Sequence, residues 1–334
     1  MSAPKTYKAA QVKEKGGKLE LVDIEYKAPG PGQIVVKVLA SGVCHSDSVV
    51  VEQHMPTGLP RVPGHEIVGD VFAVGEGEGR WKVGDRVGSG WHGGHDLTCA
   101  SCLKGDFVTC KNENINGVFT DGGHAEYVTL RTEAVCSIPT DIKPEQAAPL
   151  LTTFNSLRNM DVHPGDVVAI QGIGGLGHLG VQFARKMGYK TVALSGSDSK
   201  RALAAELGAH EYIDGSKEDQ GEALQKMGGA KVVLCTAPNP KVINTLVNGL
   251  AVNGTLLVLA VADKIDVPIV PLIMKRLSVR GWPSGRPADS EDTVKFAQTA
   301  GVEVRTETYP LEKIQDAYDS MMNGKARFRS VIVF

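Results

Sequence analysis

Apolar residues change their spacing partway along the chain. The N-terminal part carries short β-type runs, separated by Gly and Pro, such as IVVKVLA (34–40), EIVGDVFAV (66–74) and AEYVTL (125–130). Short runs of this kind, punctuated by turn residues, predict an irregular β domain or a partly open barrel.

A different pattern begins at Asp166. The run DVVAIQ (166–171) leads through a glycine cluster into LGHLGVQFARKMG (176–188), whose apolar residues have helical spacing, and KTVALS (190–195) follows. Apolar strands that alternate with helices predict βαβ units on a parallel sheet covered on both faces. After Trp282 the pattern reads helix, strand, helix and a last strand, SVIVF (330–334). Periodicity leaves open whether this tail extends the parallel sheet or returns to the first domain.

Length and composition bound the class of protein. A chain of 334 residues exceeds the size at which one core keeps growing, so two lobes are expected. The formal net charge of -2 gives no reason to expect nucleic acid or an anionic membrane as partner. The N-terminus lacks the apolar segment of a signal peptide, and no run reaches the roughly 18 apolar residues of a membrane helix. Six cysteines, three of them between 99 and 110, suggest metal binding in a reducing, cytoplasmic compartment.

The glycine cluster has the spacing of a dinucleotide-binding turn. It reads Gly172-Ile173-Gly174-Gly175-Leu176-Gly177, after a buried-type strand and before a helix. In this context the first glycine permits a tight turn, the second lets a pyrophosphate approach the backbone, and the last lets the helix pack on the strand. The helix N-terminus then offers free N–H groups to the phosphates.

The end of the next strand indicates which dinucleotide binds. NAD enzymes usually place Asp or Glu there, to bind the ribose hydroxyls. This chain has Ser195 and Ser197 at that point, followed by Lys200 and Arg201. These hydroxyls and cations would accept a 2′-phosphate, so we favour NADP(H) over NAD(H). In the other interpretation, Lys200 and Arg201 are only the solvated first turn of a helix that Asp198 caps.

Two groups of residues have the chemistry of zinc ligands. Asp96, Cys99, Cys102 and Cys110 place three thiolates and a carboxylate in one small loop, the donor set of a structural zinc site, with His95 and His92 as alternatives to Asp96. The segments Cys44-His45-Ser46-Asp47 and Gly64-His65-Glu66 supply a thiolate, an imidazole and neighbouring carboxylates, which also favour metal.

Together these motifs resemble the medium-chain zinc-dependent alcohol dehydrogenase family, nearly end to end. Its microbial and plant alcohol and cinnamyl-alcohol dehydrogenases look most similar. The segments that carry the resemblance are Gly42–Asp47, Pro63–Gly69, Val83–Val87, the cysteine loop, Asp121–Tyr127 (DGGHAEY) and the glycine motif. The resemblance implies a GroES-like irregular β-barrel catalytic domain, residues 1–152 and 289–334, and a Rossmann NAD(P)-binding domain with a doubly wound parallel sheet, residues 153–288.

The resemblance also implies roles for individual residues. Cys44 and His65 would hold a catalytic zinc with Glu66 as a further ligand, and Asp47 would orient His65. Ser46 would bond to the substrate oxygen and begin the proton relay. The cofactor would contact His45, Thr152 and Arg329, and the aromatic residues Trp91, Phe119 and Trp282 would line the substrate pocket. A homodimer or homotetramer is expected.

Three departures from the family pattern stand out. Asp96 replaces the first cysteine of the structural loop, and Val49 replaces a relay histidine. Family members also carry Cys-Ala-Gly and one more residue where this chain runs from Leu151 straight into Thr152, so about four residues and the third zinc cysteine are missing. Three interpretations stay open: residues absent from the printed chain, zinc held by Cys44, His65 and Glu66, or loss of the catalytic zinc. We favour the first, because losing four residues at the entry to a buried helix would rotate the helix by more than a full turn.

The leading functional hypothesis is zinc-dependent, NAD(P)-dependent interconversion of small alcohols and aldehydes. The second is an NADPH-dependent reductase of enal C=C or iminium bonds without catalytic zinc, in which Ser46 or Tyr127 gives the proton. The third is a non-catalytic NADPH-binding protein, which an incomplete metal site would permit.

Overall fold

The computed structural model describes residues 3–55, 57–261 and 264–334. The chain divides into two compact units: the first comprises residues 1–151, 284–296 and 303–334, and the second comprises 152–283 and 297–302. Helix α9 (Pro287–Ala300) contributes residues to both units. In the described part of the chain, no helix has the length and apolar character needed to span a membrane.

The first unit is built around a seven-stranded sheet with the order β16-β17-β3-β4-β5-β9, in which β8 also pairs with β3. Its centre is β3, a long strand that alternates toward the buried cluster of Ile34, Val36 and Val38. Two small two-stranded sheets, β1-β2 and β6-β7, complete the unit. The strands are β1 (Thr6–Gln11), β2 (Glu20–Glu25), β3 (Gln33–Val43), β4 (Ile67–Val74), β5 (Arg86–Ser89), β6 (His92–Gly94), β7 (Asn114–Ile115), β8 (Tyr127–Arg131), β9 (Cys136–Ser137), β16 (Thr306–Pro310) and β17 (Arg329–Val333).

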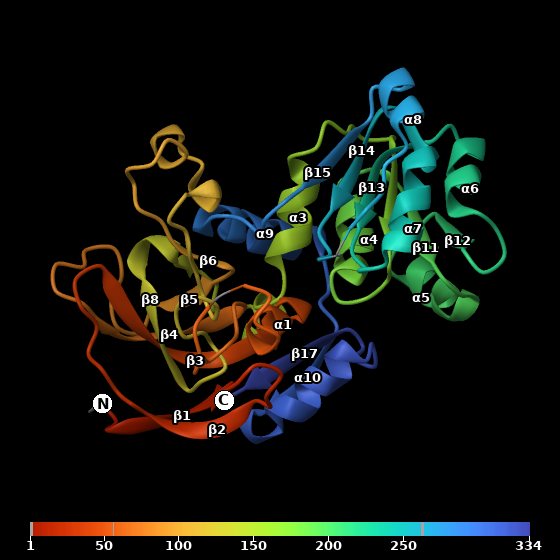
Figure 1. Cartoon of the computed structure of the whole chain (residues 1–334). Helices are drawn as coiled ribbons and strands as arrows, with labels where there is room; N and C mark the ends of the chain where they lie inside the picture. Colours follow the sequence, from red (N-terminus) through yellow and green to blue (C-terminus); the bar gives the residue numbers. More distant parts are fainter. Residues whose placement is uncertain (1–2, 56, 262–263) are drawn as a thin grey trace. The chain divides into compact units, whose positions relative to one another are not determined.

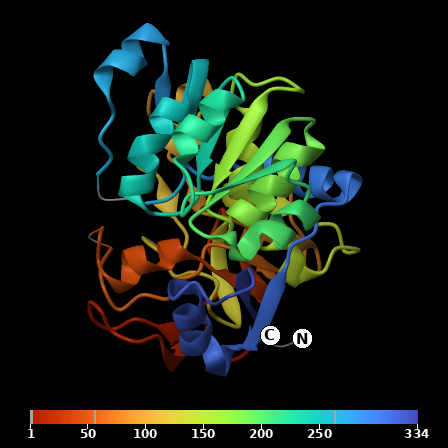
Figure 2. The same ribbon diagram turned by 90° about the vertical axis from the view of Figure 1, so that its right-hand side faces the viewer.

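The C-terminal tail belongs to this first unit. Strand β17 pairs antiparallel with β3, with Val331 opposite Gly42. Helix α10 (Ile314–Met322) buries Ile314 and Ala317 against Ala10 and Val12 of the N-terminal part. Figures 1 and 2 both show blue α10 beside the red first strands. The short helices α1 (Ser48–Val51) and α2 (Pro144–Ala147) complete the unit.

The second unit is a six-stranded sheet of parallel strands, in the order β12-β11-β10-β13-β14-β15. On one face Ala169 and Val233 pack in a single buried cluster with Leu224 of α6 and Leu246 of α7. On the other face Gly180 of α4 lies against Ile170 and Leu234. These residues follow Ala169 and Val233 in their strands, so their side chains point to the opposite face of the sheet. The doubly wound parallel sheet predicted from the sequence is therefore confirmed (Figure 1). The elements are β10 (Val167–Gln171), β11 (Lys190–Ser195), β12 (Glu211–Asp214), β13 (Ala230–Cys235), β14 (Leu250–Val258), β15 (Ser278–Gly281), α3 (Leu151–Arg158), α4 (Gly177–Lys186), α5 (Arg201–Glu206), α6 (Gln220–Lys226), α7 (Pro240–Leu246) and α8 (Ile269–Met274).

Candidate active site and metal centres

The glycine turn joins β10 to α4 with little room for side chains. Gly172 has φ +85°, a backbone conformation that disfavours other residues. A Cβ on Gly177 would lie 1.7 Å from the Gly172 carbonyl oxygen, so a side chain there would force the helix away from the strand. A Cβ on Gly174 would meet nothing within 4 Å. The turn is thus tight where the chain packs on itself and open where a phosphate would approach.

A cavity of about 440 Å³ adjoins this turn, within the second unit. Gly172, Ile173, Ser195, Gly196 and Lys200 line it. Lys200 Nζ donates to the Ile173 carbonyl oxygen at 2.7 Å, which ties the turn that follows β11 to the glycine turn.

Besides Lys200, two more of the residues proposed to bind a 2′-phosphate have other contacts. Arg201 Nε donates to Asp198 at 2.6 Å, and the Arg201 guanidinium stacks over the Tyr212 ring at 4.6 Å. Ser197 Oγ lies 2.9 Å from Ser199 Oγ. Of the four residues, Ser195 and Lys200 line the cavity and Ser197 and Arg201 do not.

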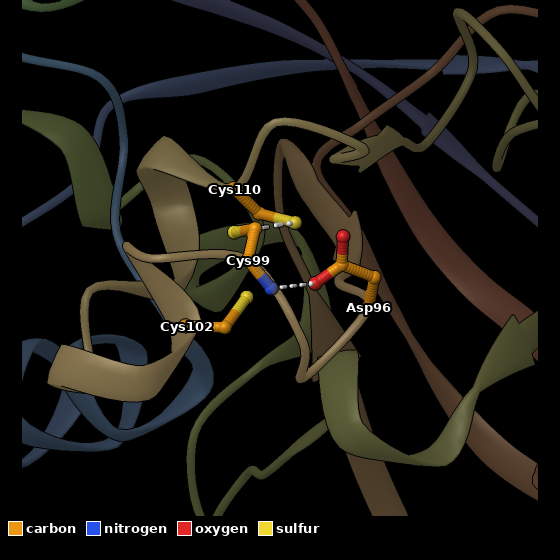
Figure 3. A group of neighbouring side chains, drawn as sticks. All are labelled: Asp96, Cys99, Cys102 and Cys110. Atoms are coloured by element: carbon orange, nitrogen blue, oxygen red, sulfur yellow. Dashed lines mark hydrogen bonds between the residues drawn. The ribbon is translucent and has the colours of Figure 1, made fainter.

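The cysteine loop brings its four donors together (Figure 3). One donor atom from each of Asp96, Cys99, Cys102 and Cys110 lies within 4.8 Å of every other. Asp96 Oδ1 accepts from the backbone N–H groups of Thr98 and Cys99, at 2.8 and 3.0 Å, and these bonds lower the pKa of its carboxyl. The Cys99 and Cys110 sulfurs are 3.8 Å apart. Two thiolates at about 2.3 Å from a tetrahedral zinc are also about 3.8 Å apart, so the loop fits that metal.

A second donor group forms where β3 ends and β4 begins. Cys44 directly follows β3, and His65 and Glu66 directly precede β4. Because β3 and β4 run antiparallel, with Ser41 opposite Ile67, these ends meet. One donor atom each from Cys44, His65 and Glu66 lies within 4.8 Å of the others. A thiolate, an imidazole and a carboxylate are the ligand types that zinc takes.

Asp47 stands behind His65. It closes the 3-10 turn His45–Asp47, where its Oδ2 accepts from the Cys44 backbone N–H at 2.9 Å. Its Oδ1 lies 3.2 Å from His65 Nδ1, a close ionic contact rather than an aligned hydrogen bond. Burial by itself would raise the pKa of Asp47, but the imidazoles of His65 and His124 lower it far below the usual value. Burial would likewise lower the pKa of His65, and Asp47 and Cys44 raise it well above the usual value.

Arg329, at the start of β17, contacts the Glu66 carboxylate through both of its oxygens. The pairing of β17 with β3 brings it there, because Ser330 lies opposite Val43. Only 4% of Arg329 is exposed. Burial would lower its pKa, but Glu66 and Cys44 raise it above the usual value. A buried cation therefore already balances part of the negative charge of this donor group.

Comparison with known proteins places these features in a family. Residues 30–140 match the alcohol dehydrogenase GroES-like domain, and residues 175–299 match the zinc-binding dehydrogenase domain. Alcohol dehydrogenase patD of Penicillium expansum is 49% identical over 99% of this chain and 98% of its own length. Alcohol dehydrogenase notN of an Aspergillus strain is 45% identical over 99% of both chains. The solved structure of a cinnamyl alcohol dehydrogenase from Sorghum bicolor, SbCAD4, has a TM-score of 0.89 and 27% identity over 98% of both chains.

The chain belongs to the medium-chain zinc-dependent alcohol dehydrogenase family.

Membership confirms the predicted GroES-like and Rossmann fold class and the prediction of an alcohol dehydrogenase, an oxidoreductase. It supports zinc and a nicotinamide cofactor in general terms. The roles of individual residues remain predictions, and the geometry of each unit bears on them.

In this alcohol dehydrogenase, other predicted site residues lie as follows. His45 is exposed and Ser46 half-buried in the turn beside Cys44, and buried Val49 follows in α1. Thr152 is half-buried in the first turn of α3. Trp91 packs edge-on against the His65 ring, with ring centroids 4.9 Å apart.

The remaining two aromatic residues have different surroundings. Phe119 is 38% exposed. Trp282 is stacked under Arg280 in the second unit. Of these three aromatic residues, Trp91 is the one that contacts a proposed zinc ligand.

The gap inferred before Thr152 falls at the beginning of a regular helix. Helix α3 begins at Leu151 and buries Phe154 and Leu157. Cys136 bonds to the Gly88 carbonyl oxygen, and Cys235 lies buried on β13. In the described part of the chain neither joins a group of metal-donor residues, so the second donor group holds one cysteine.

Sequence reasoning missed two features of this site. It assigned Arg329 to the cofactor and did not foresee its contact with Glu66. It noted the segment DGGHAEY but gave no role to His124, whose Nε2 lies 3.3 Å from Asp47 Oδ2. A histidine in a glycine-rich stretch next to buried strands was the signal that could have drawn attention to it.

Proposed function

We propose that this dehydrogenase interconverts small alcohols and aldehydes with NADP(H), and that Cys44, His65 and Glu66 hold a catalytic zinc. The observation that carries the proposal is the convergence of these three donors at the adjoining ends of β3 and β4, with Asp47 behind His65. His65 Nδ1 and Asp47 Oδ1 are both buried and face each other at 3.2 Å, which fits a histidine whose other ring nitrogen is held by a metal.

Zinc in this position would act as a Lewis acid on the substrate oxygen, and the nicotinamide would accept or give the hydride. The side chains have separate tasks. Asp47 fixes the orientation of the His65 ring. Ser46, half-buried in the same turn as Asp47, accepts the hydroxyl proton of the alcohol at its Oγ while its own hydroxyl proton passes toward solvent, because Val49 offers no imidazole for that step.

The contact between Arg329 and Glu66 favours the alternative of a reductase without catalytic zinc, because a buried cation next to the donors would oppose a second one. Zinc analysis combined with the substrate preference separates the two. Two zinc ions per chain, one of them lost in Cys44→Ser, support the alcohol dehydrogenase. One zinc ion per chain, and reduction of enals in preference to aldehydes, would contradict it.

Cofactor preference follows from the residues around the glycine turn. Ser195 at the tip of β11 has no negative charge, and the Lys200 ammonium lines the same cavity. We therefore expect a higher kcat/KM with NADPH than with NADH. Ser195→Asp should shift the ratio toward NADH by roughly 100-fold, because a carboxylate there would repel a 2′-phosphate and bind the ribose hydroxyls. Ser199→Asp, on the exposed turn beyond the strand, is the matched control and should leave the ratio nearly unchanged. Equal use of the two coenzymes by the parent protein would contradict the preference.

A structural zinc in the cysteine loop is the second metal proposal, supported by its four converging donors. None of the six cysteines, all of which lie in the described part of the chain, forms a disulfide, and this also supports the proposal of a cytoplasmic location. For the substrate, the Trp91 ring against His65 supports an apolar or aryl alcohol of medium size. Comparison of kcat/KM for benzyl alcohol and ethanol in the parent and in Trp91→Ala tests this, since loss of the ring should weaken the benzyl preference.

We also propose that two copies of the chain pair through the second unit. Strand β15 is the last of its sheet, and all four of its residues are exposed. Beside it in sequence, α8 exposes Val270, Ile273 and Met274, of which Met274 is 77% exposed. Antiparallel pairing of β15 with the same strand of a second copy would satisfy its free backbone groups and cover these side chains. Light scattering should show a smaller particle for Ile273→Asp than for Val83→Asp, a control that is also exposed and apolar but lies in the first unit.

A further inference from the structure

His124 is the central residue of the DGGHAEY segment and is completely buried. Its ring makes two contacts: Nδ1 lies 2.9 Å from Ser41 Oγ, and Nε2 lies 3.3 Å from Asp47 Oδ2. Ser41 belongs to β3 and Asp47 to the turn that follows it, so the ring bridges two points on one stretch of chain.

The surroundings of His124 leave it little freedom. A Cβ on Gly64 would come within 2.8 Å of both the backbone nitrogen and Nδ1 of His124. Gly64 itself has φ +104°, and the Gly123 backbone N–H donates to its carbonyl oxygen at 2.9 Å. The backbone that precedes His65 therefore packs directly against the ring and the backbone of His124.

The direction of the hydrogen bonds follows from the acceptor. An ionised Asp47 can only accept, so His124 Nε2 carries the hydrogen and donates to Oδ2. In the neutral ring Nδ1 then accepts from the Ser41 hydroxyl. Oδ2 also accepts from the Cys44 N–H, so two donors hold this oxygen and turn Oδ1 toward His65 Nδ1. That contact leaves His65 Nε2 as the nitrogen that faces a metal.

We propose that His124 is a positioning residue for the zinc ligand His65, acting through Asp47. The inference rests on the proposed catalytic zinc site. Without the His124 N–H, the buried carboxylate loses one of the two donors that fix its plane, and the His65 ring loses its fixed orientation. Loss of an outer partner of a zinc-bound histidine typically weakens metal binding 10- to 100-fold.

A pair of amide variants tests this while keeping a polar residue in the core. His124→Gln carries its N–H group near the position of Nε2 and can still reach Asp47. His124→Asn carries it near the position of Nδ1 and can reach only Ser41. The rate at which the holoenzyme releases zinc to a chromogenic chelator measures how tightly each site holds its metal. The phase of release that is seen in the parent and absent in Cys44→Ser belongs to the proposed catalytic zinc. We expect ~10-fold faster release in that phase for His124→Asn and for His124→Phe, and a rate near that of the parent for His124→Gln.

Two further measurements separate positioning from simple packing. The visible spectrum of the cobalt-substituted protein should shift in His124→Asn and not in His124→Gln, while thermal unfolding of the metal-free proteins should be similar for the two. Equal zinc release in all variants would overturn the inference, as would a loss of metal-free stability with unchanged release. If the parent protein holds no zinc that depends on Cys44, the proposed function fails as well. If that zinc is present but its release does not respond to the His124 variants, the inference about His124 alone fails.

Discussion

The two donor groups of the first unit are assembled in opposite ways. The cysteine loop draws all four donors from residues 96–110. The bonds that hold Asp96 come from Thr98 and Cys99 of the loop and from Asn112 just after it. The second group draws Cys44 and His65 from the facing ends of two strands, and the residues that hold these donors come from farther along the chain. His65 faces Asp47, which His124 contacts in turn, and Glu66 is paired with Arg329 near the C-terminus.

The difference shows what each site depends on. A loop site needs only a short segment, so its geometry is nearly independent of the sheet. The second site depends on the antiparallel pairing of β3 with β4 and β17, and its charge balance uses a residue more than 260 positions from Glu66 in sequence. Breaking the loop should therefore affect mainly stability, while removing a proposed zinc ligand from the second group should affect mainly chemistry.

The largest effect is expected from Cys44→Ser. Loss of the thiolate should abolish binding of the proposed catalytic zinc, a Lewis acid that would contribute several kcal/mol, so kcat/KM for alcohol oxidation should fall about 1,000-fold or more. Zinc per chain should decrease from two to one, measured by atomic emission. Unchanged activity would mean that zinc at Cys44 takes no part in the reaction.

Arg329→Gln should have the next largest effect. It tests whether Glu66 is only paired with the Arg329 cation or also binds the metal. Without the guanidinium, Glu66 becomes a buried carboxylate with no cation, which typically costs about 3–5 kcal/mol. The metal-free protein should therefore unfold roughly 10 °C lower by calorimetry. Added zinc should restore more stability to this variant than to the parent, because zinc would replace the lost charge. Equal stabilisation of both proteins by zinc would show that Glu66 does not take part in metal binding.

Local features were predictable from the sequence for a physical reason. The glycine turn and the cysteine loop are each set by a few consecutive residues: only glycine tolerates the Gly172 backbone conformation, and three cysteines at short spacing converge on their own. The parallel sheet was predictable because its strands are apolar and alternate with helices.

Other features depend on pairing between distant strands. Periodicity did not reveal that SVIVF pairs with β3, because a short apolar strand fits either sheet. The contact of Arg329 with Glu66 and that of His124 with Asp47 follow from that pairing and from the path of the glycine-rich segment. Neither partner can be recognised from residue type alone.

Cys102→Ser should have the opposite effect to Cys44→Ser: stability should fall while activity is kept. It removes a buried thiolate from the cysteine loop, so one zinc should again be lost, at a cost of about 3 kcal/mol in the free energy of unfolding. Per folded molecule, kcat/KM should remain within about threefold of the parent, because the second donor group does not use the loop. Activity that disappears in proportion to the lost zinc, in protein that is still folded, would contradict the separation of the two sites.

The smallest effect is expected where the loop departs from the family. Asp96→Cys would supply a fourth thiolate, a softer donor than a carboxylate, and should slow zinc release from the loop about tenfold. The gain is limited, because Asp96 also accepts from two backbone N–H groups that a thiolate bonds less strongly. Asp96→Asn keeps these turn contacts and removes the charge, so it should speed release. If Asp96→Asn and the parent release zinc at the same rate, Asp96 holds the turn and not the metal, and the fourth ligand must come from water or from a neighbouring histidine.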